Sequence, residues 1–298
     1  MRASVSGEPK LKLREDIDCT KKYPASRYLD DGEVKVVDSP IGKYRTSMRS
    51  KFNFQTPNGF VYNFAIKNPG KPHWIEIEYP DDKPRFFYVV VEEKLDNMGW
   101  GKDKHTFSYS LATIGIANGL NNPITGNMAK KRLLFWPDSE QCLIGCFGYK
   151  TYPDTMGPAM KSIRIYENDG ELPKLAVNTP AGMPQRAIGN WQEDGFMPTG
   201  CWFNRYKYNE GPSFDFWREK LKRRVEYVRF TGQNQIVIQV FRNGDMTGMQ
   251  GVFPSDSSDK MPGWSTLAAT IFDREKIPFY IQTCDYTGTS KMLHAKIS

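Results

Sequence analysis

The sequence predicts a mainly β protein, in which a jelly-roll-type β-sandwich precedes a partial α/β segment of barrel-like type. Short runs with alternating apolar and polar residues fill residues 33–168, and no helical pattern lies between them. Turn-forming sequences such as NPGKP at 68–72 and PDDKP at 80–84 separate these runs. After Pro212, helical patterns alternate with apolar strand patterns, which is typical of parallel strands layered with helices.

These patterns divide the chain into four expected segments. Residues 1–32 carry little periodicity, whereas residues 170–212 combine prolines with a run of aromatic residues that a free linker would lack. We therefore expect an N-terminal extension (1–32), a β-sandwich domain (33–169), an interdomain connection (170–212) and a partial α/β barrel-like segment (213–298).

Individual strands of the sandwich follow from period-two patterns. In HWIEIEY, Ile75 and Ile77 point to one face, and in MKSIRIYE, Ile163 and Ile165 do the same. Trp74 stands on the polar face of its strand, so we expect a neighbouring loop or domain to cover it. The run RFFYVVVEE is apolar on both faces, which predicts a central strand or one covered by a loop.

Two helices and two strands are expected in the C-terminal segment. The stretch FDFWREKLKRRVEYVRF predicts a helix that ends at Gly232, with an apolar stripe on its inner face. The stripe consists of Trp217, Leu221, Val225 and Val228. The runs IVIQVF at 236–241 and PFYIQT at 278–283 predict buried strands, and Ser265 is expected to cap the helix between them. The inner face of this second helix consists of Leu267, Ala268 and Ile271.

The charge pattern does not favour nucleic acid as a partner. The net charge is +7, but 41 basic residues are interleaved with 34 acidic ones along the whole chain. The densest basic cluster, REKLKRR at 218–224, is interpreted as the solvated face of a helix rather than a phosphate-binding patch. We expect no membrane span, because no apolar run approaches the roughly 20 residues that a bilayer requires.

The five cysteines are expected to be reduced core residues. If Cys142 and Cys146 lie on one strand, they are about 13 Å apart, which is too far for a disulfide. The sequence has no CxxC motif, and its three histidines lie far apart. We therefore expect no metal site and no cofactor.

Two stretches resemble a known class of enzymes. RRVEYVRFTGQNQIVIQV and KIPFYIQT resemble the first units of the (β/α)8 barrels of glycoside hydrolases. IEIEYPDDKPRFFYVVVEE and AMKSIRIYE resemble the paired strands of the carbohydrate-binding or galactose-binding-like modules that precede such barrels. The resemblance implies the N-terminal part of a glycoside hydrolase with an accessory glycan-binding sandwich, whose partner is a poly- or oligosaccharide.

The length of the chain limits what this resemblance implies. A (β/α)8 barrel needs about 250 residues, and only residues 213–298 follow Pro212. The catalytic carboxylates of such enzymes lie on later strands, so we do not expect them in this chain. A second copy of the chain or a missing C-terminal domain would complete the barrel-like segment.

The resemblance also implies an extracellular or periplasmic protein, although the N-terminus lacks the apolar stretch of a signal peptide. The alternative is a non-enzymatic secreted or surface module that recognises glycan or protein.

Candidate binding residues follow the strands of the barrel-like segment and occupy a long loop of the sandwich. Sugar hydroxyls require hydrogen-bonding side chains, and sugar rings require aromatic platforms. The candidates after the two strands are Arg242, Asn243, Asp245, Asp285 and Tyr286. The candidates in the loop are Trp100, His105 and Tyr109. Ordinary loop polarity is the alternative interpretation of the first set.

Overall fold

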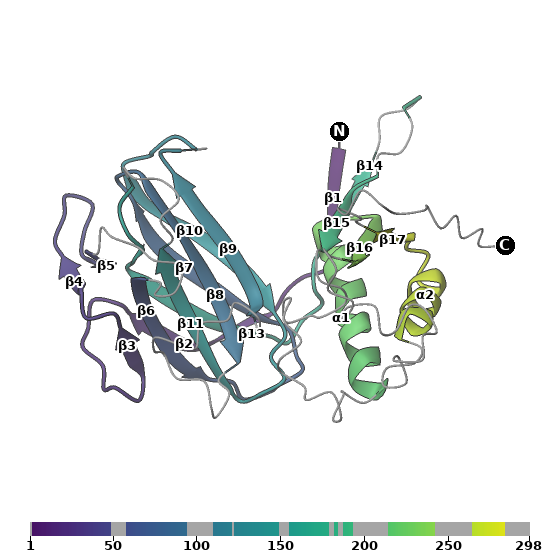
Figure 1. Ribbon diagram of the computed structural model, residues 1–298, viewed down its shortest axis with the longest axis horizontal. Helices are drawn as coiled ribbons and strands as arrows, with labels where there is room; N and C mark the ends of the chain where they lie inside the picture. The colour runs from purple at the N-terminus through teal and green to yellow at the C-terminus, as the bar shows by residue number, and fades with distance from the viewer. Residues whose placement is uncertain are drawn as a thin grey trace. The chain divides into compact units, whose positions relative to one another are not determined.

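The computed structural model describes most of two compact units. The described residues are 2–48, 58–93, 110–120, 122–148, 155–178, 182–183, 187–192, 214–241 and 264–283. One unit comprises Glu8–Leu172, and the other combines Met1–Gly7 with Pro173–Ser298. The described residues are mainly β, as predicted, and include two helices (Figure 1).

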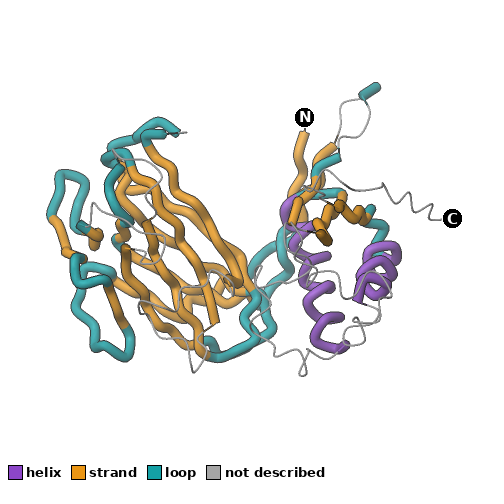
Figure 2. Tube along the Cα trace, in the orientation of Figure 1, coloured by secondary structure: helices purple, strands orange, loops and turns teal. Residues whose placement is uncertain are grey.

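The Glu8–Leu172 unit is a sandwich of two antiparallel sheets, shown as orange strands in Figure 2. The four-stranded sheet has the order β10-β7-β13-β2, and the five-stranded sheet has the order β3-β6-β11-β8-β9. The first comprises β2 (Leu11–Asp18), β7 (His73–Asp81), β10 (Asn127–Phe135) and β13 (Ser162–Asn168). The second comprises β3 (Tyr28–Asp30), β6 (Asn58–Ala65), β8 (Arg85–Glu93), β9 (Ser110–Asn118) and β11 (Gln141–Gly148). A three-stranded sheet of the same unit comprises β4 (Val34–Val37), β5 (Tyr44–Ser47) and β12 (Ala159–Met160).

Alternating apolar residues of both sheets form the core between them. On the four-stranded sheet, Ile75, Ile77, Ile163 and Ile165 are buried, which confirms the predicted inner face. They belong to one cluster with inner residues of the five-stranded sheet, such as Phe87. Burying an aliphatic or aromatic side chain of this size contributes about 1.5–3 kcal/mol. This cluster is therefore the main source of stability of the sandwich.

The N-terminal residues differ from the expected extension. β2 pairs with β13 and forms an edge of the four-stranded sheet. The alternation of apolar and polar residues does not identify β2 as a strand. A bulge opposite Ile165 and Tyr166 of β13 inserts Arg14 as an extra residue in β2, which breaks the period of two. β1 (Arg2–Ser6) pairs instead with β14 (Lys174–Asn178), in the other unit.

The second unit contains three parallel strands in sequential order, β15-β16-β17. They are β15 (Gly189–Gln192), β16 (Gln235–Phe241) and β17 (Phe279–Thr283). Helices α1 (Phe214–Thr231) and α2 (Trp264–Arg274) connect them. The parallel pairing of β16 and β17 agrees with the expected α/β layer, whereas β15 lies in the segment expected to be a connection. Three strands in sequential order can begin a barrel or an open sheet, so the barrel stays a prediction.

The helices largely follow the sequence patterns. Gly232 adopts a φ of +67° after the last turn of α1, as expected for a helix stop. Leu221, Val225 and Val228 are buried against α2, whereas the side chain of Trp217 lies outside the described residues. On α2, Ala268 is buried, and Leu267 and Ile271 pack against the same cluster. Ser265 lies inside α2, which begins one residue earlier.

The basic cluster on α1 needs a correction. Arg218 and Lys222 are exposed, as a solvated face requires. Lys220, however, is only 5% exposed, and burial lowers the pKa of Arg224. These two basic side chains of α1 are therefore not part of a fully solvated face. Within the described chain, neither helix has the length and apolarity needed to cross a membrane.

Candidate functional site

The outer face of the five-stranded sheet is unusually apolar for a surface. In the register of β8, Tyr88 lies opposite Phe147 on β11 and Gly115 on β9, and Val90 lies opposite Gly145. Residues opposite each other share a face, so Phe86, Tyr88, Val90 and Glu92 form one row across the outside of the sandwich. We call this surface the five-stranded face. β8 lies between β11 and β9, which confirms the predicted central strand.

Two aromatic rings of this row are partly open to solvent. The rings of Phe86 and Tyr88 pack edge to face, with centroids 5.4 Å apart. Both side chains are half-buried, and Gly115 beside them is exposed. A Cβ atom at Gly115 would lie 3.5 Å from Cε1 of Tyr88, so the ring lies close to the glycine backbone. The pair therefore presents aromatic surface near the edge strand β9.

The middle of the five-stranded face is closed. A Cβ atom at Gly145 would lie 2.0 Å from the Phe147 ring, so only glycine admits that ring over the strand. Phe147, Val61 and Val90 form a buried cluster separate from the main core, with Tyr88 and Leu143 packed against it. Val90 has no exposed surface. This cluster gives the aromatic pair a rigid support.

Glu92 ends the row with a buried carboxyl group. It lies opposite Leu143 and is only 9% exposed. Burial raises its pKa to about 8, so the carboxyl group is mostly protonated at neutral pH. A buried acid with a strongly shifted pKa is a frequent mark of a functional site.

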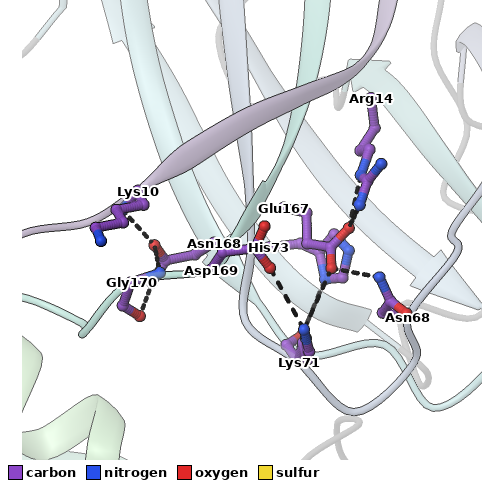
Figure 3. A network of polar contacts seen from close by, with 9 residues as sticks. All are labelled: Lys10, Arg14, Asn68, Lys71, His73, Glu167, Asn168, Asp169 and Gly170. Atoms are coloured by element: carbon purple, nitrogen blue, oxygen red, sulfur yellow. Dashed lines mark hydrogen bonds and ion pairs between the residues drawn. The ribbon is translucent and has the colours of Figure 1, made fainter.

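A second polar cluster lies at an end of the four-stranded sheet (Figure 3). The Glu167 side chain, which is 1% exposed, accepts hydrogen bonds from Arg14 and from Nδ2 of Asn68. The ammonium group of Lys71 lies 3.6 Å from Glu167 and 3.4 Å from Asp169. Burial alone would raise the pKa of Glu167, but the hydrogen bonds from Arg14 and Asn68 outweigh it and lower the pKa.

His73 and Asn168 extend this cluster. His73 lies opposite Glu167 across the strands, with Nδ1 2.9 Å from the carbonyl oxygen of Lys71, and burial lowers its pKa. The side chain of Asn168 accepts hydrogen bonds from the backbone N–H groups of Lys10 and Gly170. The cluster ties β2, β7 and β13 together where the chain enters and leaves the sandwich. Its saturated hydrogen bonds indicate a structural clasp rather than a binding site.

The binding residues expected from the sequence lie outside the described residues. They are Trp100, His105, Tyr109, Arg242, Asn243, Asp245, Asp285 and Tyr286. These eight assignments therefore stay predictions. Trp74 is described and is 9% exposed on the outer face of the four-stranded sheet, which confirms that it is covered. Cys19, Cys142 and Cys146 are buried thiols that form no disulfide within the described part of the chain, as expected.

Phe86, Tyr88 and Glu92 were not among the residues expected from the sequence. The available signal was RFFYVVVEE, whose second face carries two aromatic residues where a solvated strand would carry polar ones. Among the residues that the structure describes, no group of three His, Cys, Asp or Glu side chains is arranged to hold a metal ion.

Neither a protein-family model nor a curated protein matches the sequence. Among solved structures, the chain is similar to a carbohydrate binding module from Cellvibrio mixtus lichenase 5A in complex with cellotriose. The identity is 13%, the match covers 52% of this chain and 97% of that one, and the TM-score is 0.31. A C-terminal module of a laminarinase from Zobellia galactanivorans matches with 13% identity over 51% of this chain and 97% of that one, with a TM-score of 0.31. An exo-β-1,3-galactanase from Phanerochaete chrysosporium matches with 10% identity over 54% of this chain and 29% of that one, with a TM-score of 0.29. At TM-scores this low, function has to be argued from the residues of this chain.

Proposed function

We propose that the sandwich is a glycan-binding module, and that a poly- or oligosaccharide lies on the five-stranded face against Phe86 and Tyr88. The observation that carries this proposal is the half-open aromatic pair beside the exposed Gly115. Aromatic rings offer a large, rigid surface at a low cost in conformational entropy, and the C–H groups of a sugar ring pack well on it. Gly115 has no side chain, so the Tyr88 ring lies against its backbone and remains half-open at this edge of the sheet.

The long segment between β8 and β9 contributes the other proposed contacts of the module. It contains Trp100, His105 and Tyr109, and it joins the strand that carries the aromatic pair to the strand that carries Gly115. Loops that join strands of a rigid scaffold commonly carry binding residues. These three side chains are therefore proposed to complete the glycan site.

The second unit is proposed to belong to the glycoside hydrolase part of the protein. β16 and β17 are parallel neighbours, so their carboxyl ends meet at one edge of the sheet. The proposed sugar contacts Arg242, Asn243 and Asp245 follow β16, and Asp285 and Tyr286 follow β17. The catalytic carboxylates would lie on later strands, supplied by a further domain, and the protein would act outside the cell or in the periplasm.

A binding assay with matched variants tests the glycan-binding role. The probes are hydroxyethyl cellulose, laminarin and a soluble galactan, and the measurement is the Kd from isothermal titration calorimetry. The variants Phe86→Ala and Tyr88→Ala should each weaken binding about tenfold or more, because each removes a ring from the platform. The control Tyr166→Ala removes a half-buried ring from the outer face of the other sheet and should leave the Kd unchanged.

Two outcomes would contradict the proposal. One is a wild-type protein that binds none of the three probes. The other is a protein whose binding survives loss of Tyr88 but not loss of Tyr166. Release of reducing sugar from the probes would separate an enzyme from the alternative, a non-enzymatic binding module.

A further inference from the structure

The edge strand β9 differs from the other edges of the sandwich. Within the described chain, β8 is the one strand that pairs with β9, so the other side of β9 presents unpaired backbone N–H and C=O groups. Such edges are usually protected by charge, by a bulge or by shortness. β10 carries the exposed basic residues 130–132, β2 carries charges and a bulge, and β3 has only three residues. β9 has nine residues and no charge.

The sequence of β9 is suited to pairing with a second copy of itself. A bulge sets Leu111 apart, and the regular stretch that remains, Ala112–Asn118, is centred on Gly115. Ile114 and Ile116 flank this glycine symmetrically. When two copies pair antiparallel about Gly115, each Ile114 lies opposite the partner's Ile116, and the two glycines lie opposite each other. A glycine inside a strand allows another backbone to approach closely, and no like charges meet across this pair.

The side chains at this edge also favour a covering strand. Ala112 and Ile114 pack against the sandwich core but are only half-buried. A second strand would bury part of this apolar surface and would satisfy the backbone groups of the edge. We propose that β9 is a dimer interface, at which two copies of the chain pair antiparallel about Gly115 and join their five-stranded sheets into one. Such an interface is closed by a two-fold axis, because each copy contributes the same surface.

The dimer brings two copies of the proposed glycan site together. Tyr88 lies opposite Gly115 on the outer face, so one row runs from Tyr88 through the two glycines to the partner's Tyr88. At a strand spacing of about 4.8 Å, the two tyrosines are about 14 Å apart. Both copies therefore contribute an aromatic ring to a shared site for an oligosaccharide. This part of the inference rests on the proposed function, whereas the dimer interface does not.

Disulfide trapping tests the interface in the full chain. Opposed residues of an antiparallel pair have Cα atoms about 4.5–5.5 Å apart, which a disulfide can span. Gly115→Cys should therefore form a cross-linked dimer with oxidised glutathione, as seen by non-reducing gel electrophoresis. A Cβ atom at Gly115 meets the Tyr88 ring at 3.5 Å, an ordinary contact, so this variant should fold. The control Ala65→Cys places a thiol at an exposed position of the interior strand β6 and should not be cross-linked.

Sedimentation velocity tests the same pairing without a covalent bond. The wild type should form a reversible dimer, and salt should not dissociate it, because β9 carries no charge. Gly115→Lys and Gly115→Glu should each weaken the dimer at least about tenfold, because each sets two like charges opposite each other. An equal mixture of these two variants should restore it. Circular dichroism reports whether each variant folds.

Oligosaccharides test whether the site is shared. Cellohexaose or laminarihexaose that contacts both tyrosines binds the dimer better than the monomer, so it should tighten the dimer of the wild type. It should not tighten the dimer of Tyr88→Ala. Glucose cannot reach both rings and should leave the dimer unchanged.

The outcomes separate the interface from the proposed function. A monomeric wild type, a dimer that salt dissociates, or equal cross-linking of Gly115→Cys and Ala65→Cys overturns the interface. If a hexasaccharide binds but leaves the dimer unchanged, the shared site is overturned, and the interface and the glycan-binding role stand. If no saccharide binds while Gly115→Cys is cross-linked, the proposed function fails and the interface stands.

Discussion

At the scale of single residues, Glu167 shows how this fold stabilises a buried charge. Its donors, Arg14 and Asn68, come from a strand and a loop distant in sequence, and Lys71 adds a nearby positive charge. A buried carboxylate is stable only when such partners replace the water it has lost. Since the net result is a lowered pKa, the charged form is favoured in the folded state.

The variant Glu167→Gln should therefore destabilise the sandwich. It removes the charge that compensates Arg14, which is itself largely buried, and we expect a loss of about 2–4 kcal/mol in the free energy of unfolding. Urea denaturation at pH 7 measures the loss. The control Asp16→Asn breaks an exposed pair with Arg164 and should cost at most about 1 kcal/mol. Equal losses for the two variants would show that the cluster is no more than surface charge.

The pH dependence of this loss has a definite sign. Because the pKa of Glu167 is lower in the folded than in the unfolded protein, its stabilising contribution is present above the unfolded value and disappears as the pH falls. His73 acts in the same direction, because its lowered pKa means that the unfolded chain takes up the proton first on acidification. The stability difference between the wild type and Glu167→Gln should therefore shrink when the unfolding is repeated at acidic pH.

At the scale of elements, the sequence predicted strands and helices wherever the local pattern was regular. Apolar and polar residues alternate in β7 at residues 75–79 and in β13 at residues 162–165, and Gly232 marks the end of α1. β2 was missed because a bulge interrupts its alternation and because it places charged residues in the sheet. β15 was missed because its four residues, GNWQ, have no strand pattern of their own and are ordered by pairing with β16. RFFYVVVEE indicates two apolar faces for β8, but the neighbours of Tyr88, namely Phe147 and Gly115, follow from pairing with β11 and β9, which local sequence does not reveal.

The end of α1 gives a test at this scale. Gly232 has a φ of +67°, and a Cβ atom there would lie 3.0 Å from Leu175 of β14. Gly232→Ala should cost about 1 kcal/mol for the left-handed backbone and more for displacing Leu175. The matched control is Gly182→Ala, because Gly182 has a φ of +81° but nothing within 4 Å of the added atom. Denaturant unfolding should rank Gly232→Ala as the more destabilised variant. The opposite order would mean that contact with β14 does not constrain the end of the helix.

At the scale of the whole molecule, the two units have separate cores. The sandwich core contains Ile75, Phe87 and their neighbours, whereas the core of the other unit contains Leu221, Phe272 and residues around them. The chain passes between the units twice, at Gly7–Glu8 and at Leu172–Pro173. Each unit thus has its own hydrophobic cluster, as an independently folding domain requires.

The two sets of boundaries for the sandwich lead to different outcomes for isolated fragments. Residues 8–172 include β2, which pairs along β13 and buries Ile17 in the core. Residues 33–169, the boundaries expected from the sequence, lack β2 and also lack Arg14, the partner of Glu167. Without them, the edge of β13 is unpaired and a buried carboxylate loses its compensating charge.

We therefore expect fragment 8–172 to unfold in one cooperative thermal transition and fragment 33–169 to be unfolded or aggregated. Differential scanning calorimetry and near-ultraviolet circular dichroism distinguish the two states. A cooperative transition for fragment 33–169 at the same temperature would show that β2 is dispensable, and that the N-terminal residues are the extension that the sequence suggests.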